Sequence, residues 1–224
     1  MRYLWLVPLL GLLCSCKQEE ARPQPPVAAS AAAPPARPVD DRPVIACFGD
    51  SLTAGFGVDP GHSYPDLLQQ ELDRRGYHYH VVNLGESGDT TQDGLDRMSL
   101  VMADKPRITI VEFGANDGLR GQPVSNMENN LSQMIDTFQK AGIRVVLAGI
   151  TLPPNYGPDY IRHFDAVYPA LAARYHVPRI PFLLAGAAGR ANLMQPDGLH
   201  PNTAGTQLVA ANVLKALEPL LSRD

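Results

Sequence analysis

Cysteine is scarce in this sequence, and the positions of its three cysteines exclude a disulfide framework. Cys14 and Cys16 lie close to the amino terminus, in a stretch with the character of a processed leader. Cys47 stands inside an apolar run, where a free cysteine behaves as a small hydrophobic side chain. We therefore interpret Cys47 as a buried core residue without a reactive role.

Excess basic charge is missing as well. The chain has a formal net charge of −4 at neutral pH, which argues against nucleic-acid binding as its main task.

The apolar run from Leu4 to Leu13 is too short to span a bilayer permanently. Hydrophobic residues make up 45% of the chain, which is enough for one well-buried core but hardly for two. We find no internal repeat.

Residues 1–16 have the organisation of an export signal, with Arg2 ahead of the apolar run. The sequence Leu-Cys-Ser-Cys at 13–16 resembles a bacterial lipobox, in which Cys16 receives the lipid. This resemblance implies a lipoprotein of the bacterial cell envelope that faces the periplasm. Lys17 after the cysteine is similar to the pattern of outer-membrane sorting. A secretory signal without a lipid is the alternative.

Residues 17–42 are rich in Ala and Pro and contain no apolar periodicity. Seven of the 21 prolines of the chain fall between Pro23 and Pro43. Such a segment cannot bury enough apolar surface to offset its ordering entropy, so we expect a flexible, semi-extended tether. The remaining residues, 43–224, would form one domain.

Strand and helix patterns alternate along that domain. Apolar or β-branched runs predict strands at 44–49, 79–84, 107–113, 143–150 and 178–182. Helical periodicity predicts helices at 64–76, 90–104, 124–141, 159–176 and 203–221. In the second helix Leu95, Met98 and Met102 would share one face, and Pro169 must start, kink or divide the fourth.

This order predicts an α/β fold, a three-layer α/β/α sandwich around a flavodoxin-like, five-stranded parallel sheet. Ser51 follows the first strand, Gly88 the second and Asn116 the third. Because the carboxyl ends of parallel strands lie along one edge of the sheet, these residues should gather there.

Ser51 lies in Gly-Asp-Ser, a sequence that by itself indicates no more than a turn between a strand and a helix. Near the other end of the chain, Asp197 and His200 offer an acid and an imidazole three residues apart. Serine becomes a strong nucleophile when an imidazole accepts its proton and an acid orients that imidazole. The three residues therefore make a candidate catalytic triad. Activity should then fall on the acid side of neutrality, as His200 is protonated.

An acyl-transfer site also needs donors for the developing oxyanion. The candidates are the backbone N–H groups of Ser51 and Gly88 and the side-chain amide of Asn116. Gly85, nearer the strand end, is the alternative to Gly88. Asp50 is expected to cap the turn before Ser51 rather than to serve in the triad. Asp89, Glu112 and Asp117 are alternative acids for the triad, but each lies in a segment already assigned to a loop or a strand. Five further histidines are interpreted as surface residues, with a metal site at His78 and His80 as the less favoured alternative: His62, His78, His80, His163 and His176.

Four segments resemble sequence blocks of the SGNH (GDSL) hydrolase superfamily. They are Gly-Asp-Ser-Leu-Thr at 49–53, Asn-Leu-Gly-Glu-Ser-Gly-Asp-Thr-Thr at 83–91, Gly-Ala-Asn-Asp-Gly-Leu-Arg-Gly at 114–121 and Asp-Gly-Leu-His-Pro at 197–201. Asn-Asp-Gly-Leu-Arg-Gly and Leu-Pro-Pro-Asn-Tyr-Gly-Pro are most similar to the periplasmic multifunctional thioesterase, lysophospholipase and arylesterase branch. The resemblance extends over nearly all of 44–220. Ala115 stands where a Gly is common, and the lipobox is unusual for this branch.

The resemblance implies a serine hydrolase of acyl esters or thioesters, acting through an acyl-enzyme on a small acyl ester or a lysophospholipid-like molecule. It implies no metal or other cofactor. The net charge argues against a nucleic-acid partner, the lipobox-like sequence predicts a membrane anchor through its lipid, and we expect a monomer by default. Substrate-binding residues in that branch would correspond to Gly118, Leu119, Pro153, Asn155 and Tyr156. The alternatives are a carbohydrate O-acetylesterase of the same superfamily and a non-catalytic, lipid-anchored binding module.

Overall fold

The computed structural model describes residues 40–223, which form one compact unit. The predicted export signal, Cys16 and most of the predicted tether lie outside the described residues. Asp40 and Arg42, placed in the tether by the sequence, are described. Arg42 contacts Asp40 and, at 3.3 Å, Asp73.

The five strands are parallel and form one sheet in the order β2-β1-β3-β4-β5. The register places Gly49 beside both Gly85 and Glu112, so three strands end at the same level. The strands are β1 (Val44–Gly49), β2 (His80–Gly85), β3 (Ile108–Glu112), β4 (Arg144–Ala148) and β5 (Arg179–Ile180).

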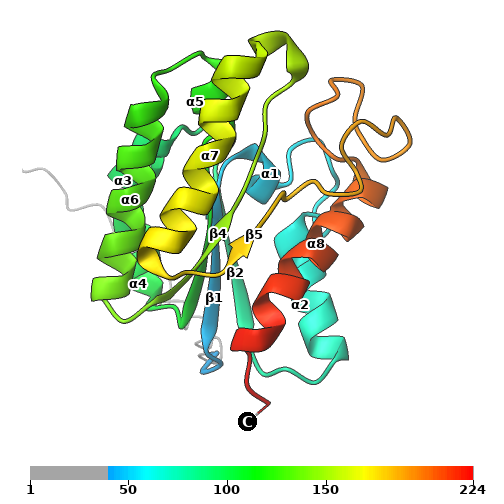
Figure 1. Cartoon of the computed structure of the whole chain (residues 1–224). Coiled ribbons are helices and arrows are strands. Elements are labelled where there is room, and N and C mark those ends of the chain that lie inside the picture. Colours follow the sequence, from blue (N-terminus) through cyan, green and yellow to red (C-terminus); the bar gives the residue numbers. More distant parts are fainter. Residues whose placement is uncertain (1–39, 224) are drawn as a thin grey trace, which may run out of the picture. The chain divides into compact units, whose positions relative to one another are not determined.

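Helices cover both faces of the sheet, with α2 and α8 on one side and α3, α4, α6 and α7 on the other (Figure 1). The helices are α1 (Ser51–Ala54), α2 (Tyr64–Arg74), α3 (Thr91–Asp96), α4 (Met98–Asp104), α5 (Ala115–Leu119), α6 (Val124–Lys140), α7 (Pro158–Tyr175) and α8 (Thr203–Leu217). Two 3₁₀ segments, Pro154–Tyr156 and Glu218–Leu220, complete the structure. The predicted three-layer sandwich with a flavodoxin-like strand order is confirmed.

The core lies on both faces of β1, β3 and β4, whose apolar residues are almost entirely inaccessible to solvent. Phe48 makes edge-to-face contacts with Phe113 and Phe138, which joins β1 to the helical layer of α6. Cys47 is buried and free, as expected, and burial raises the pKa of its thiol to about 12. Within residues 40–223, no helix is both long enough and apolar enough to cross a membrane.

The single helix predicted over 90–104 is wrong, because the chain forms two helices that meet at Arg97. The guanidinium of Arg97 turns inward and donates to the carbonyl oxygens of Leu84 and Gly49. The helical register shifts at this point, so Val101 is buried and Met102 is exposed, contrary to the predicted face.

Proline affects two other helices in ways that the sequence did not predict. Pro169 neither starts nor divides α7, which continues from Pro158 to Tyr175 with the proline on its exposed side. The last helix ends at Leu217 rather than 221, and a 3₁₀ turn containing Pro219 follows. The strand predicted over 178–182 is limited to Arg179 and Ile180.

Candidate functional site

The turn after β1 presents Ser51 at the first position of a short helix. Asp50 is the N-cap of α1, and its carboxylate accepts the backbone N–H of Leu52 at 3.0 Å. The helix stops after Ala54 because Gly55 adopts a left-handed conformation. This short turn leaves the Ser51 side chain at the edge of the sheet, where ligands bind in open α/β folds.

A loop between β5 and α8 brings Asp197 and His200 to the same edge. One Asp197 oxygen accepts the backbone N–H groups of Leu199 and His200 at 2.9 and 3.0 Å. Gly198 has φ of +70°, a left-handed conformation that closes this turn at no steric cost. The other Asp197 oxygen is therefore left free to face the imidazole.

These three side chains form a continuous chain of hydrogen bonds. His200 Nδ1 lies 2.7 Å from Asp197 Oδ2, and His200 Nε2 lies 2.9 Å from Ser51 Oγ. Partial burial acts to raise the pKa of Asp197, but the hydrogen bonds from His200 and Leu199 outweigh it and hold this pKa below its usual range. An ionised Asp197 fixes the proton on Nδ1, which leaves Nε2 able to accept the serine proton.

The loop that carries His200 is braced against the loop after α1. Gln195 donates from its side-chain amide to the backbone carbonyls of Phe56, at 2.7 Å, and Pro201, at 3.0 Å. The Phe56 ring lies 4.6 Å from the His200 ring, centre to centre. Sequence reasoning missed both Phe56 and Gln195, because their contacts span 139 residues.

The three candidate oxyanion donors belong to residues that line one groove. Among the described residues, the backbone N–H groups of Ser51 and Gly88 donate to no protein acceptor, and both residues line the groove described below. The amide of Asn116 lines it as well. Gly85 is not an equivalent candidate, because its backbone N–H donates to Asn83 Oδ1 at 2.9 Å and Gly85 does not line the groove.

Two arginines hold the loops that carry these donors. Arg97 lies under the aromatic rings of Phe48 and Phe113 in a cation–π arrangement and pairs with Asp89. The backbone carbonyl of Asp89 in turn accepts the Asn116 amide at 2.9 Å. Arg120 donates to the carbonyl oxygen of Gly88 at 2.8 Å, which holds the Gly88–Asp89 peptide next to the candidate donor.

None of the other acidic residues weighed from the sequence hydrogen-bonds to His200. Asp89 pairs with Arg97, and Asp117 accepts both the backbone N–H and the hydroxyl of Thr91. Asp50 and Glu112 are fully buried beneath the turn. Within the described part of the chain no group of His, Cys, Asp or Glu has the arrangement of a metal site, and His78 is exposed outside β2.

An apolar groove of about 580 Å³ opens beside Ser51. The segment from 182 to 200 forms one wall, and the segment from 150 to 154 forms another. Its apolar lining consists of Leu52, Phe56, Ala115, Leu119, Ile150, Leu152, Pro153, Pro154, Phe182, Leu184, Ala188, Met194 and Leu199. Ser51, Gly88, Asn116 and His200 occupy its polar part. The arrangement can hold an apolar chain while a serine attacks a polar group at its end.

The residues expected to bind substrate divide into two groups. Leu119 and Pro153 line the groove. Gly118 is packed against Leu152, Asn155 is exposed, and Tyr156 donates to the carbonyl oxygen of Leu119 at 2.9 Å instead of facing the groove. Their contact with substrate stays a prediction, and the wall from Phe182 to Leu199 was missed because that loop has no periodicity.

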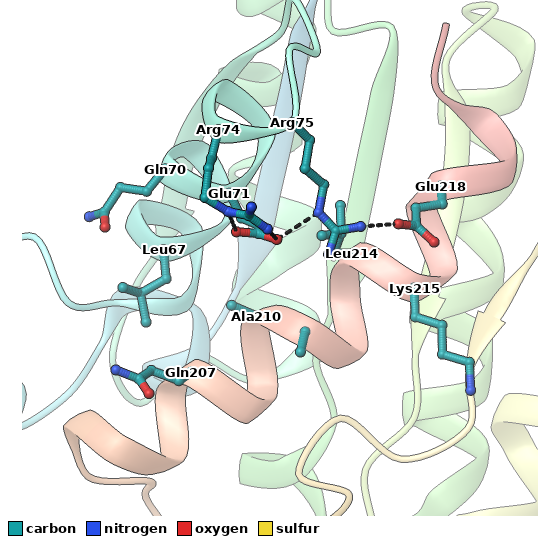
Figure 2. Close-up of a pocket in the computed structure, with 11 residues that line it drawn as sticks. Leu67, Gln70, Glu71, Arg74, Arg75, Gln207, Ala210, Leu214, Lys215 and Glu218 are labelled. Atoms are coloured by element: carbon teal, nitrogen blue, oxygen red, sulfur yellow. Dashed lines mark hydrogen bonds and ion pairs between the residues drawn. The ribbon is translucent and has the colours of Figure 1, made fainter.

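A second hollow, of about 490 Å³, lies between α2 and α8 (Figure 2). Leu67, Ala210 and Leu214 form its floor. Its charged rim is largely paired within the protein, since Arg75 bridges Glu71 and Glu218. No serine, cysteine or histidine lines this hollow, so it lacks the chemistry found beside Ser51.

Comparison with protein families matches residues 47–208 to the GDSL-like Lipase/Acylhydrolase family. Esterase TesA of Pseudomonas aeruginosa is 43% identical over 174 residues, which cover 77% of this chain and 87% of that enzyme. Thioesterase 1/protease 1/lysophospholipase L1 of Escherichia coli K12 is 38% identical over 178 residues, covering 79% and 84% of the two chains.

An arylesterase of Vibrio mimicus is 39% identical over 171 residues, covering 76% of this chain and 86% of the arylesterase. Among solved structures, the crystal structure of TesA superposes with a TM-score of 0.77 at 42% sequence identity. It covers 80% of this chain and 99% of the crystallised one. The residues matched by the family, 47–208, include every residue that lines the groove.

Proposed function

The chain belongs to the GDSL-like lipase/acylhydrolase family and hydrolyses carboxylic esters or thioesters, and from this premise we propose that Ser51, His200 and Asp197 are its catalytic triad. The observation that supports this proposal is the unbroken chain of hydrogen bonds from Asp197 through His200 to Ser51. Ser51 and His200 line the same groove as Gly88 and Asn116, the other two residues proposed to donate to the oxyanion. The geometry of the hydrogen-bond chain matches the roles of nucleophile, base and orienting acid.

In the first half of the reaction, Ser51 Oγ attacks the acyl carbon and His200 Nε2 takes the hydroxyl proton. The carbonyl π electrons move onto oxygen, and the backbone N–H groups of Ser51 and Gly88 and the Asn116 amide bind this oxyanion. Collapse of the intermediate breaks the bond to the leaving alcohol or thiol. His200 delivers its proton to the leaving group, which leaves Ser51 acylated.

In the second half, water takes the place of the leaving group. His200 removes a proton from the water, whose oxygen attacks the acyl carbon. The same donors hold the second oxyanion. When this intermediate collapses, His200 returns the proton to Ser51 Oγ and the carboxylic acid leaves. Asp197 stabilises the imidazolium formed in each half and stays ionised throughout.

The groove favours an apolar acyl chain over an acetyl group. A lining of aliphatic and aromatic side chains stabilises a bound alkyl chain by about 0.8 kcal/mol for each buried methylene. An acetyl ester would leave most of this surface uncovered. The substrate we propose is therefore a medium- or long-chain acyl ester or thioester, rather than an acetylated carbohydrate.

Turnover of p-nitrophenyl esters from acetyl to palmitoyl tests this proposal. We expect kcat/KM to rise with chain length until the groove is filled. Ser51→Ala should abolish turnover on every ester, while Ser125→Ala, a change at an exposed serine of α6, should leave it unchanged. Turnover that survives Ser51→Ala would show that Ser51 is not the nucleophile. A maximum of kcat/KM at the acetyl ester would favour the acetylesterase alternative.

An alkyl phosphonate ester gives an independent test of the nucleophile. Attack by Ser51 would form a stable tetrahedral adduct that resembles the oxyanion intermediate. Intact-mass measurement should show one adduct, located at Ser51 by peptide mapping and missing in Ser51→Ala. An adduct at another serine would contradict the assignment. Labelling does not require the natural leaving group, so it also distinguishes a triad with a narrow substrate range from a non-catalytic binding module.

We also propose that the enzyme works from a membrane anchor in the cell envelope. The support is the lipobox-like sequence at 13–16 and the Ala/Pro-rich segment at 17–42 that separates it from the folded unit. A lipid on Cys16 would keep the groove near the surface where acyl lipids lie. The proposed state is a monomer without a cofactor.

A further inference from the structure

Glu112 lies directly below the catalytic turn but outside the groove. The side chain is fully buried at the end of β3. Its Oε2 accepts the backbone N–H of Asp50 at 3.2 Å and the hydroxyl of Thr53 at 2.8 Å. A Cβ at Gly49 would lie 2.5 Å from the same oxygen, so a glycine is required there. The turn before Ser51 is therefore shaped around the Glu112 carboxyl.

Asp50 and Glu112 are two buried carboxyl groups joined through the hydrogen bond from the Asp50 backbone N–H to Glu112 Oε2, and each carboxyl group affects the pKa of the other. A hydrogen bond between the two carboxyl groups themselves would require that one of them supply a proton. Asp50 already receives donors from Leu52 and Asn116, whereas Glu112 Oε1 is buried and has no donor among the described residues. A proton held by this pair would therefore lie on Glu112, at the oxygen that has no hydrogen-bond partner.

This arrangement bears on the oxyanion donor Asn116. Its Nδ2 has two hydrogens, and both are already donated within the protein. One goes to the carbonyl oxygen of Asp89 at 2.9 Å and the other to Asp50 Oδ2 at 3.2 Å. An oxyanion must take over one of them. The longer bond to Asp50 is the weaker, so its hydrogen is the one that can be released.

We propose that Glu112 is a positioning residue whose protonated carboxyl donates to Asp50 and thereby frees one Asn116 hydrogen for the oxyanion. The proposal rests on the oxyanion role assigned to Asn116 above. A hydrogen bond from Glu112 reduces the negative charge that Asp50 presents to the amide, so Asp50 competes less strongly for the hydrogen. If Glu112 lost its proton, Asp50 would lose this donor and would compete more strongly for the Asn116 hydrogen. A second negative charge would also lie beneath the oxyanion hole, and both changes would slow the reaction.

The surroundings of Glu112 favour its neutral form. Burial raises the pKa of Glu112 well above its usual range, and the charge of Asp50 raises it further. Tyr64 on α2 and Tyr168 on α7 interact electrostatically with this carboxyl, and burial raises the pKa of both hydroxyls, which keeps them neutral. No Lys, Arg or His side chain in the described part of the chain contacts the Glu112 carboxyl, although His200 acts on Asp50 at longer range.

Two substitutions separate this role from a merely structural one. Glu112→Gln keeps a donor for Asp50 and an acceptor for Thr53, and it cannot ionise. Glu112→Leu removes the donor but is similar in size. We expect Glu112→Gln to retain kcat within about threefold of the parent enzyme, whereas Glu112→Leu should lower kcat by about 10²-fold, as loss of an oxyanion donor does, with KM nearly unchanged.

The dependence of kcat on pH distinguishes this role from an effect on folding alone. We expect kcat of the parent enzyme to fall at alkaline pH as Glu112 ionises, and that fall should be missing in Glu112→Gln. Circular dichroism at each pH would show that both proteins remain folded. An identical alkaline fall in both, or a Glu112→Gln variant with kcat reduced about 10²-fold, would overturn the proposal. So would a Glu112→Leu variant that melts earlier but retains kcat.

Phosphonate labelling keeps this test separate from that of the triad. If the phosphonate labels Ser51 in the parent enzyme, but Glu112→Gln and Glu112→Leu have the same kcat and the same pH profile, only the proposed role of Glu112 is wrong. If Ser51 is not labelled, or Ser51→Ala retains turnover, the triad itself is wrong.

Discussion

Asp197 has two tasks at once, because one oxygen holds the backbone of its own turn and the other holds the His200 ring. Asp197→Asn would keep an acceptor for the backbone, yet an amide can also favour the wrong tautomer of the imidazole. We expect kcat to fall by about 10³- to 10⁴-fold with little loss of thermal stability. Steady-state kinetics and a melting curve would test this.

The matched control for that substitution is Asp159→Asn, at an exposed aspartate that pairs with Arg162 on the surface of α7. It should leave kcat unchanged. An Asp197→Asn enzyme with more than about a tenth of the parent kcat would show that another group orients His200.

The buried carboxyls Asp50 and Glu112 also make stability depend on pH. Burial raises the pKa of Asp50 from 3.8 to about 6 and that of Glu112 well above 4.5. In the unfolded chain both groups lose their protons at lower pH, so above about pH 5 the folded state binds more protons than the unfolded state. The free energy of unfolding should therefore decrease as pH rises through neutrality.

Melting temperatures measured between pH 5 and 9, at constant ionic strength, would show this trend. Glu112→Gln should make the decline shallower, because Asp50 can then ionise without a second carboxylate beside it. Glu86→Gln, at an exposed glutamate, should leave the slope as it is. A Glu112→Gln variant with the same slope as the parent protein would exclude this pair as the cause.

At the scale of single residues, the sequence was most informative where the chemistry is restricted to a few side-chain types. Ser51, Asp197 and His200 could be proposed together because few other combinations of these types occur after a strand or within one turn. Glu112 was read as a strand residue, which it is. Its importance depends on a contact with Asp50 across 62 residues, and no local pattern reports such a contact.

At the scale of elements, periodicity located every strand and every long helix but not the ends or breaks. The break at Arg97 depends on carbonyl groups of two neighbouring strands, so helical periodicity alone could not indicate it. The turn at Gly-Asp-Ser predicted a helix after it, but not that α1 would be so short, since four residues are too few for a period. Both features lie next to the site and shape it.

The brace between two loops leads to a prediction at this scale. Gln195→Ala would remove the bonds from the His200 loop to the carbonyl oxygens of Phe56 and Pro201. Each bond contributes about 1 kcal/mol, so the distance between His200 and Ser51 should become more variable. We expect kcat/KM to fall about tenfold, and Gln133→Ala on the exposed face of α6 to have no effect. An unchanged kcat/KM in Gln195→Ala would show that the loop holds its shape without the brace.

At the scale of the whole molecule, the strand order could be predicted because alternating strands and helices allow few topologies once crossovers are short and right-handed. That order alone brings Ser51, Gly88 and Asn116 to one edge. The shape of the groove could not be predicted in the same way. Its far wall comes from Phe182 and the irregular loop that follows, whose path is determined by packing rather than by local propensity.

The relation of the enzyme to the membrane gives the last prediction. If Cys16 is lipidated, cells supplied with radioactive palmitate should label the protein, and Cys16→Ser should remove both the label and its membrane association. Cys14→Ser is the matched control, because serine is also small at the −2 position and should leave lipidation intact. Residues 17–39, which precede the compact unit, would span up to about 70 Å in an extended form, at about 3.1 Å per residue, and this would allow the groove to reach lipids of the same membrane. Activity of the released Cys16→Ser protein should be unchanged on soluble p-nitrophenyl esters and reduced on esters embedded in vesicles. Label that persists in Cys16→Ser, or disappears in Cys14→Ser, would contradict the assignment of the lipid to Cys16.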